Sequence, residues 1–190
     1  MLHKQRKVSC AIFGDGMIGK SALIKAFLGE KFSHQYIATT SETHNGCVRY
    51  EGEKYNVEIT DLAGEREEGV FSNDQFRNTD VFIVCYSVND RESFDGIRSF
   101  WIPELCKQRN KPKIVLVGLQ SDGRLKENAM ENHVSYMEGL LLQHEIKAID
   151  FVESSAFLGS NINCIFESVV DITVKHRKKR MFLLKRAFGR

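Results

Sequence analysis

Short apolar runs alternate with amphipathic stretches along most of this chain. The apolar runs predict six strands, at residues 8–13, 47–50, 55–59, 81–86, 114–118 and 148–152. The helical spacing of apolar residues predicts helices at residues 21–28, 91–106, 133–144 and 162–175. Residues 51–54 contain a glycine between two strands and predict a hairpin. Since strands and helices otherwise alternate, the pattern indicates an α/β fold with a mostly parallel sheet.

Length and composition indicate one ordinary globular domain. The 190 residues are 42% hydrophobic and 27% charged, and no apolar run approaches the ~20 residues needed to span a bilayer. The first seven residues lack the apolar core of a signal peptide, and Leu2 excludes N-myristoylation. The scattered cysteines have no C-x-x-C spacing, which favours reduced thiols, and the histidines have no spacing typical of zinc ligands. We therefore expect a cytoplasmic protein without zinc.

Basic residues are concentrated at the C-terminal end. Residues 175–190 contain eight lysines and arginines and no acidic residue, which leaves 19 basic and 25 acidic residues in the remainder. We therefore expect a domain at residues 1–175 and a basic tail at residues 176–190. Because residues 181–184 and Phe188 are apolar, the tail is typical of a segment that lies on an anionic membrane surface. A solvated tail, a nuclear-import signal and an RNA-binding patch are the alternatives, with nucleic acid the less favoured partner.

One stretch of the chain has the spacing of a phosphate-binding loop. It fits G-x-x-x-x-G-K-[ST] between a predicted strand and a predicted helix, and it comprises Gly14, Asp15, Gly16, Met17, Ile18, Gly19, Lys20 and Ser21. Glycines let consecutive backbone N–H groups point at one anion, and the helix that continues through Ala22 adds its positive dipole end. Lys20 supplies a cation for the outer phosphates, and the Ser21 hydroxyl can bind Mg²⁺. The stretch predicts a site for a nucleoside triphosphate.

Two further segments supply candidates for the metal and the terminal phosphate. Asp61 closes the third predicted strand, where it can hold Mg²⁺ through a water molecule, and Gly64 can donate its N–H to a terminal phosphate. Thr39 lies in a polar stretch after the first helix and can bind Mg²⁺ by its hydroxyl, with Thr40 as the alternative. The candidate metal ligands are therefore Ser21, Thr39 and Asp61.

The segments after the last two strands carry candidates for binding a purine base. Asp122 can accept both N–H groups on the Watson–Crick edge of guanine, and adenine offers no such donor pair. Ser155 and Ala156 follow the sixth predicted strand, where a backbone N–H can bind the guanine carbonyl. The alternative for Asp122 is a helix cap. Together with the phosphate loop, these residues favour GTP over ATP.

Several segments together match one protein family. They are residues 14–21, 36–39, 79–88, 93–94 and 101–104, the last of which has the pattern W-x-P-E. On these residues the chain resembles a Ras-superfamily small GTPase, and specifically the Rho family. The resemblance implies the P-loop NTPase (small G-protein) fold, with a six-stranded, mostly parallel sheet flanked by five helices, and bound GTP or GDP with Mg²⁺.

The resemblance also implies further contacts and partners. It adds Phe32 and Tyr36 to the nucleotide-binding residues, with Phe32 packing against the guanine or its ribose, and core packing is the alternative for Phe32. It implies two switch regions, at residues 32–44 and 63–78, that dock effector proteins. Exchange factors and GTPase-activating proteins are the implied regulators.

The catalytic position departs from that family's pattern. Glu65 stands where these GTPases usually carry the glutamine that orients the attacking water. A carboxylate lacks the N–H donor and repels the γ-phosphate. With Glu65, Gly64 and Lys20 as the catalytic positions, we expect impaired hydrolysis, and an exposed charge without effect is the alternative.

Three residues around the nucleotide also depart from the family's pattern. Leu119 and Gln120 replace the polar residue and the lysine of the base-recognition motif, although Gln120 keeps a short stem and a polar tip at the nucleotide. Met17 is bulky where the family has a small residue beside the phosphates. Losing one or two hydrogen bonds of ~1 kcal/mol each predicts weaker nucleotide binding and fast exchange.

These features leave three functions to compare. The favoured one is a guanine-nucleotide switch of Rho-like type with weak hydrolysis. The alternatives are a GTP-loaded binding module that does not hydrolyse GTP and, less favoured, a P-loop phosphotransferase, which needs an acceptor site and an arginine-bearing lid. Since no cysteine follows Cys164, there is no C-a-a-X box, and we expect no prenyl group.

Overall fold

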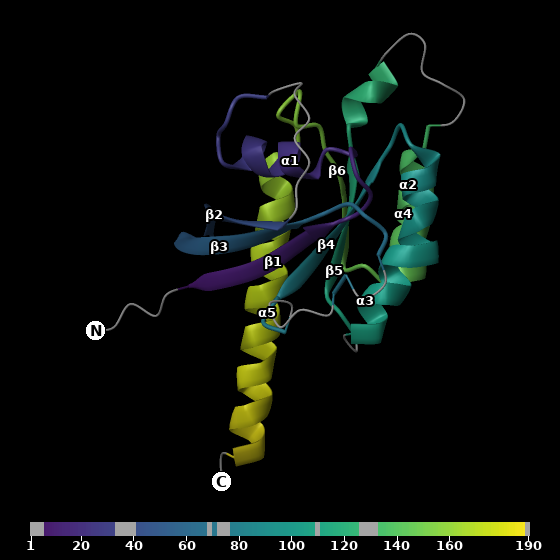
Figure 1. The fold of residues 1–190 in the computed structure, drawn as a ribbon. Helices are drawn as coiled ribbons and strands as arrows, with labels where there is room; N and C mark the ends of the chain where they lie inside the picture. Colours follow the sequence, from purple (N-terminus) through teal and green to yellow (C-terminus); the bar gives the residue numbers. More distant parts are fainter. Residues whose placement is uncertain are drawn as a thin grey trace.

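A computed structural model describes residues 6–32, 41–67, 70–71, 77–108, 111–125 and 133–188 of the chain. Within these residues, the centre of the molecule is one six-stranded sheet with the order β2-β3-β1-β4-β5-β6 (Figure 1). Neighbouring strands are parallel except for β2, which runs antiparallel to β3. The strands are β1 (Lys7–Phe13), β2 (Ser41–Tyr50), β3 (Glu53–Leu62), β4 (Val81–Ser87), β5 (Ile114–Leu119) and β6 (Asp150–Glu153). The mostly parallel α/β sheet expected from the sequence is confirmed.

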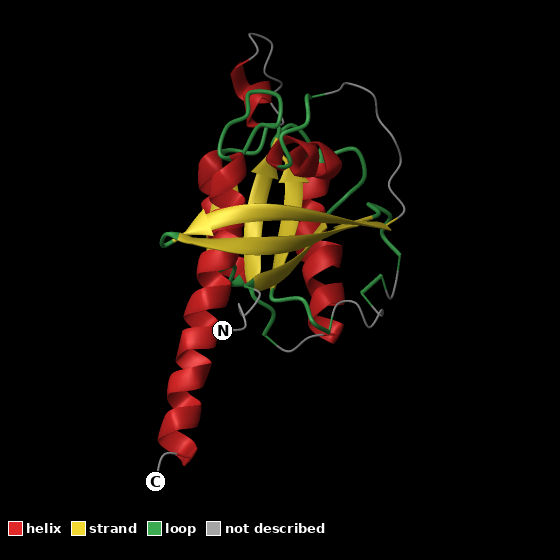
Figure 2. Cartoon of the chain, turned by 90° about the vertical axis from the view of Figure 1, so that its left-hand side faces the viewer, coloured by secondary structure: helices red, strands yellow, loops and turns green. Residues whose placement is uncertain are grey.

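Helices cover both faces of this sheet (Figure 2). On one face, α1 (Lys20–Phe27) and α5 (Ile162–Phe188) pack against the strands, and the Phe27 and Phe166 rings stack with centroids 3.8 Å apart. The other face is covered by α2 (Arg91–Gly96), the π-helix η2 (Ile97–Trp101), α3 (Ile102–Gln108) and α4 (Tyr136–Ile146). Because both faces are covered, all seven residues of β4 are buried, as in other parallel sheets.

The hairpin between β2 and β3 lies where the glycine predicted it. Glu51 and Gly52 both have positive φ angles, of 49° and 77°, which is the backbone that a tight two-residue hairpin requires. The pairing begins at Tyr50 opposite Glu53 and continues to Ser41 opposite Leu62. β2 therefore starts six residues earlier than the apolar run indicated. As an edge strand with mostly exposed side chains, its first half has no apolar alternation to reveal it.

Side-chain caps set the starts of two helices. Asp90 accepts a hydrogen bond from the backbone N–H of Glu92 at 3.0 Å, which begins α2. Ser135 and Glu138 form a reciprocal capping box, so α4 begins at Tyr136 rather than at the expected residue 133. From Arg91 to Gln108, α2, η2 and α3 follow one another without a break, and the long helix expected there therefore contains one π turn.

The last helix, α5, is much longer than the apolar spacing indicated. It continues from Ile162 to Phe188 instead of ending near residue 175, and its exposed end projects beyond the sheet (Figure 1). Two contacts support its first projecting turn: Arg177 donates to Asp80 Oδ2 at 2.8 Å, and Lys178 donates to Glu51 Oε2 at 3.1 Å. No glycine or proline interrupts these residues. Across the part of the chain that is described, no helix is long and apolar enough to cross a bilayer.

Candidate functional site

The phosphate loop connects the carboxyl end of β1 to the start of α1. Gly14 has a φ of 140°, and a Cβ atom there would lie 2.2 Å from the carbonyl oxygen of Cys85. Gly19, with a φ of 102°, is the residue directly before α1. Both glycines of the motif are therefore required by the backbone, because a side chain would collide at the first position and strain the second.

The Lys20 side chain folds back over the phosphate loop and contacts its first two residues. Its Nζ donates to the carbonyl oxygens of Gly14 at 2.8 Å and Asp15 at 2.7 Å. The side chain is only 6% exposed, and burial lowers the pKa of its ammonium group. A buried cation at a helix N-terminus attracts an anion strongly, so this arrangement suits the outer phosphates of a nucleotide.

The proposed magnesium ligands Ser21 and Asp61 lie together. The Ser21 hydroxyl donates to Asp61 Oδ2 at 2.6 Å, and Asp61 is 1% exposed at the end of β3. The other carboxylate oxygen, Oδ1, is buried and has no hydrogen-bond partner among the described residues. Burial raises the pKa of Asp61, which a nearby divalent cation would reverse. A hydroxyl beside an unsatisfied carboxylate is a donor set that fits Mg²⁺. The third candidate, Thr39, lies outside the described residues.

The segment after β3 contacts the phosphate loop directly. A Cβ atom on Gly64 would lie 2.2 Å from the backbone nitrogen of Gly16, so the two backbones touch and position 64 must be glycine. Glu65 follows in an exposed position, where its carbonyl oxygen accepts from the Glu67 N–H at 3.0 Å. Glu65 therefore lies next to the residue that contacts the phosphate loop, on the exposed side of the candidate site.

Gln120 ties the segment after β5 to the end of β4. Its Oε1 accepts from the Ser87 hydroxyl at 2.7 Å, and its Nε2 lies 3.7 Å from the position that a Cβ atom on Gly19 would take. Leu119 is 2% exposed and belongs to the apolar core. The segment after β5 is thus tied to β4 and lies along the phosphate loop, although neither family residue is present.

The two base-binding candidates Asp122 and Ser155 are in contact. The Ser155 hydroxyl donates to Asp122 Oδ1 at 2.5 Å and accepts from the backbone N–H of Leu158 at 3.1 Å. The Ser121 N–H donates to the Ser154 carbonyl at 3.1 Å, which joins the segments after β5 and β6. Ala156, the next residue, lies in the same turn. The carboxylate of Asp122 is therefore oriented by its neighbour before any base is bound.

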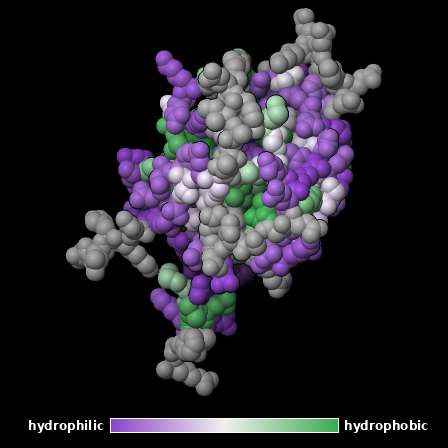
Figure 3. Space-filling view, viewed as in Figure 1, coloured by the Kyte–Doolittle hydropathy of each residue, from purple (hydrophilic) through white to green (hydrophobic). Residues whose placement is uncertain are grey.

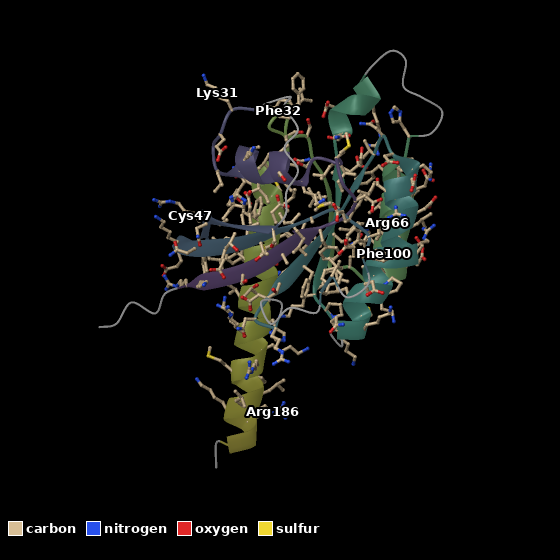
Figure 4. All side chains as sticks on the ribbon, viewed as in Figure 1. Lys31, Phe32, Cys47, Arg66, Phe100 and Arg186 are labelled. Atoms are coloured by element: carbon tan, nitrogen blue, oxygen red, sulfur yellow. The ribbon has the colours of Figure 1, made fainter. Side chains whose placement is uncertain are left out.

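Aromatic residues lie beside this base-binding end. The rings of Phe32 and Phe157 meet edge to face, with centroids 5.5 Å apart. Figure 4 shows Phe32 next to Lys31 at the end of the molecule opposite Arg186. Phe32 is 41% exposed and Phe157 57% exposed, so neither is a core residue. The position of Phe32 is therefore compatible with the expected contact to the base or its ribose, and core packing, the alternative, does not occur. Tyr36 lies outside the described residues.

A group of polar contacts around Asp15 of the phosphate loop was not indicated by the sequence. Arg66 and Trp101 both donate to the carboxylate of Asp15, at 2.8 Å from the Arg66 Nε and at 2.8 Å from the Trp101 indole nitrogen. Figure 4 places Arg66 on the side of the molecule that also carries Phe100. These partners are 51 and 86 residues away from Asp15 in sequence, so no local pattern could have revealed them.

Comparisons with known proteins relate this chain to one family. A model of the Ras family matches residues 9–175. The chain is also similar to the Ras-like GTP-binding protein RhoL of Drosophila melanogaster, with 31% identity over 165 residues. That match covers 87% of this chain and 86% of the relative.

Proposed function

The chain belongs to the Ras family of small GTPases, which are GTP-binding switches, and we propose that it is a Rho-like member that binds GTP or GDP with Mg²⁺. The contact between Asp122 and Ser155 carries this proposal, because it presents an oriented carboxylate to the edge of a guanine base. The name of the Drosophila relative supports the Rho-like assignment. Lys20 and the loop backbone would hold the phosphates, and Ser21 and Asp61 would hold the metal, which neutralises phosphate charge when bound.

Equilibrium titration of the full chain tests this function. We expect labelled GTP and GDP to bind in the presence of Mg²⁺ and ATP to bind far more weakly, because adenine cannot satisfy the carboxylate. Equal affinities for GTP and ATP would contradict the guanine assignment and favour the phosphotransferase alternative. Guanine nucleotide that binds but is never hydrolysed would favour the binding module.

Hydrolysis should be limited by Glu65. Its carboxylate cannot donate a hydrogen bond to the attacking water or to the developing negative charge, and one such donor contributes ~10²–10³ in rate. We expect Glu65→Gln to raise the single-turnover rate of GTP hydrolysis by about 10², with nucleotide affinity almost unchanged. Glu67→Gln, which removes a charge two residues away, is the matched control and should have little effect. No gain from Glu65→Gln would show that another step limits hydrolysis.

Nucleotide release should be fast without an exchange factor. Met17 has a φ of 62° and is 74% exposed, so it occupies a strained backbone position without packing in return. Gln120 Oε1 supports the base-side segment by accepting hydrogen bonds from the Ser87 hydroxyl at 2.7 Å and, at the longer distance of 3.4 Å, from Asn89 Nδ2. We expect Gln120→Ala to accelerate release of a fluorescent GDP analogue about fivefold, the equivalent of losing the shorter of these hydrogen bonds. Lys147→Ala, at an exposed position, is the control. Slow release from the wild type, unchanged by Gln120→Ala, would contradict the proposal.

Effectors, exchange factors and GTPase-activating proteins are proposed to dock on residues 32–44 and 63–78. The family assignment supports these partner classes. The second of these segments carries the charged run Glu65, Arg66 and Glu67, with Glu65 in place of the family's usual glutamine, so the surface that a partner would contact differs from that of relatives. Individual partners of relatives are therefore not transferred to this chain.

The projecting end of α5 is proposed to bind an anionic membrane surface. Four apolar side chains there, Met181, Phe182, Leu183 and Leu184, are about half exposed. Exposed basic residues surround them, and Figure 3 shows this apolar group among hydrophilic residues at the lower end of the molecule. A helix with both features can lie in the interface of an anionic leaflet without a lipid anchor.

A further inference from the structure

We propose that Arg66 is a positioning residue that clamps the start of the second switch onto the phosphate loop, so that this segment keeps one conformation whichever guanine nucleotide is bound. The clamp comprises Asp15, Arg66 and Trp101, and the segment it holds is residues 63–67. The inference rests on the proposed function, because it concerns how the same site responds to its nucleotide.

The pair between Arg66 and Asp15 has the geometry of a strong ion pair. The Arg66 Nε donates to Asp15 Oδ1 at 2.8 Å, and Nη2 contacts Oδ2, so the guanidinium and carboxylate meet at two points. The Asp15 side chain is 15% exposed and that of Arg66 is 33% exposed. Two-point charge-assisted contacts that are partly shielded from water are stronger and more directional than ordinary surface pairs.

Asp15 joins three parts of the molecule. Its side chain also accepts the Trp101 indole N–H at 2.8 Å, which fixes it to η2. Its backbone carbonyl accepts the Lys20 ammonium at 2.7 Å. Any movement of Arg66 away from Asp15 would therefore disturb the residue that positions the phosphate-binding lysine.

The guanidinium of Arg66 also fits a slot on α2. A Cβ atom at Gly96 would lie 2.5 Å from Nη2, so the absence of a side chain there makes room for the arginine. The carbonyl oxygen of Glu92 accepts from Nη2 at 3.2 Å, and the Glu92 carboxylate lies 3.8 Å from Nη1. Arg66 is thus held from the loop side and from the helix side.

A second contact lies two residues earlier on the same segment. Gly64 touches the backbone of Gly16, where a Cβ would be only 2.2 Å from the nitrogen. Residues 63–67 are therefore attached to the phosphate loop at both Gly64 and Arg66. A nucleotide can shift a conformational equilibrium only by its difference in affinity for the two states. A clamp present with either nucleotide opposes that shift, so the segment should respond little to the γ-phosphate.

Trp101 is the only tryptophan of the chain, so its fluorescence reports on the clamp without a label. The full chain is loaded with GDP or with GTPγS, and loading is verified by extracting the nucleotide. We expect the wild type to show the same Trp101 emission, and the same amide hydrogen exchange over residues 63–67, in both states. In Arg66→Ala, exchange in the GDP state should rise about tenfold or more, and emission should differ between the two nucleotides.

Matched variants separate the clamp from general damage. Arg98 lies on η2, like Trp101, but it does not belong to the clamp. Arg98→Ala removes its ion pairs with Asp95 and Glu145 and should behave as the wild type. Asp15→Asn keeps an acceptor for Trp101 but loses the charge, and it should act in the same direction as Arg66→Ala. Circular dichroism checks folding, and if Arg66→Ala unfolds, Asp15→Asn decides the result.

Two results would overturn the proposal: a wild type whose segment already differs between nucleotides as much as the variant, or an Arg66→Ala segment as protected as the wild type. If the wild type retains neither nucleotide, the proposed function fails. The comparison of Arg66→Ala with the nucleotide-free wild type then still tests the clamp by the same exchange measurement.

Discussion

Asp122→Asn should move the base preference of this protein from guanine to xanthine nucleotides. The Asp122 carboxylate can accept from two N–H groups of guanine, and an asparagine retains only one acceptor and presents an NH₂ group instead. Xanthine carries a carbonyl oxygen where guanine carries its amine, so that NH₂ group gains a partner. The contact from Ser155 to Asp122 Oδ1 remains possible with the asparagine oxygen and would point the NH₂ group toward the base.

The change should be large because the lost contacts involve a charge. Hydrogen bonds to charged groups contribute about 1.5–3 kcal/mol each, so GTP affinity should fall by about 10²-fold and XTP affinity should rise by a comparable factor. Competition of both nucleotides against a fluorescent GDP analogue measures the two affinities together.

A control distinguishes base recognition from damage to the site. Ser155→Ala removes the group that orients Asp122 without altering the carboxylate, so it should weaken both nucleotides several-fold and leave the preference for guanine intact. An Asp122→Asn protein that still prefers GTP would mean that Asp122 does not contact the base.

The geometry of the candidate nucleotide site could be predicted where one short segment carries both the residue types and their spacing. The phosphate loop is such a segment: its glycines, Lys20 and Ser21 are contiguous, and the neighbouring strand and helix follow from apolar periodicity. The proximity of Ser21 to Asp61 also follows, because Asp61 lies at the carboxyl end of β3 and Ser21 lies in the first turn of α1, which the phosphate loop joins to the carboxyl end of the neighbouring parallel strand β1.

The remaining features depend on contacts between distant segments. Nothing near Arg66 in sequence indicates Asp15, and the slot that accepts its guanidinium depends on Gly96 being opposite. The sequence likewise predicted that Leu119 and Gln120 would cost one or two hydrogen bonds around the nucleotide. In the fold, Leu119 belongs to the core, and Gln120 joins the segment after β5 to Ser87 at the end of β4, which the sequence did not indicate.

The length of α5 could not be predicted from hydrophobic periodicity either, for a different reason. Beyond Val174 the helix has no apolar core face, so hydrophobic periodicity ends there although the helix continues. Its continuation is supported by Arg177 with Asp80 and by Lys178 with Glu51, which are pairs formed by folding. The basic tail expected from composition is therefore partly attached to the domain and partly exposed.

This division determines how membrane binding should be tested. Arg177 and Lys178 contact the domain, so removing them would confuse attachment of the helix with attraction to lipid. Four basic residues beyond or beside them are fully available to a membrane: Lys179, Arg180, Lys185 and Arg186 are all exposed. The base-binding end marked by Phe32 lies at the opposite end of the molecule (Figure 4), so docking through α5 would leave the nucleotide site facing away from the membrane.

Replacing these four residues with glutamine should abolish binding to vesicles that contain phosphatidylserine. Each basic residue near an anionic surface contributes about 1 kcal/mol, so four together correspond to about 10³-fold in affinity. Wild-type binding should fall steeply as salt is raised, because screening shortens the reach of the charges. Truncation after Lys178 keeps both domain contacts and should remove vesicle binding while nucleotide binding persists.

A control variant replaces four exposed lysines elsewhere with glutamine, at Lys31, Lys54, Lys111 and Lys147. It makes the same change in charge and should leave vesicle binding nearly intact. Equal losses in the two quadruple variants would reduce the effect to overall charge, and vesicle binding that survives the truncation would exclude α5 as the docking element.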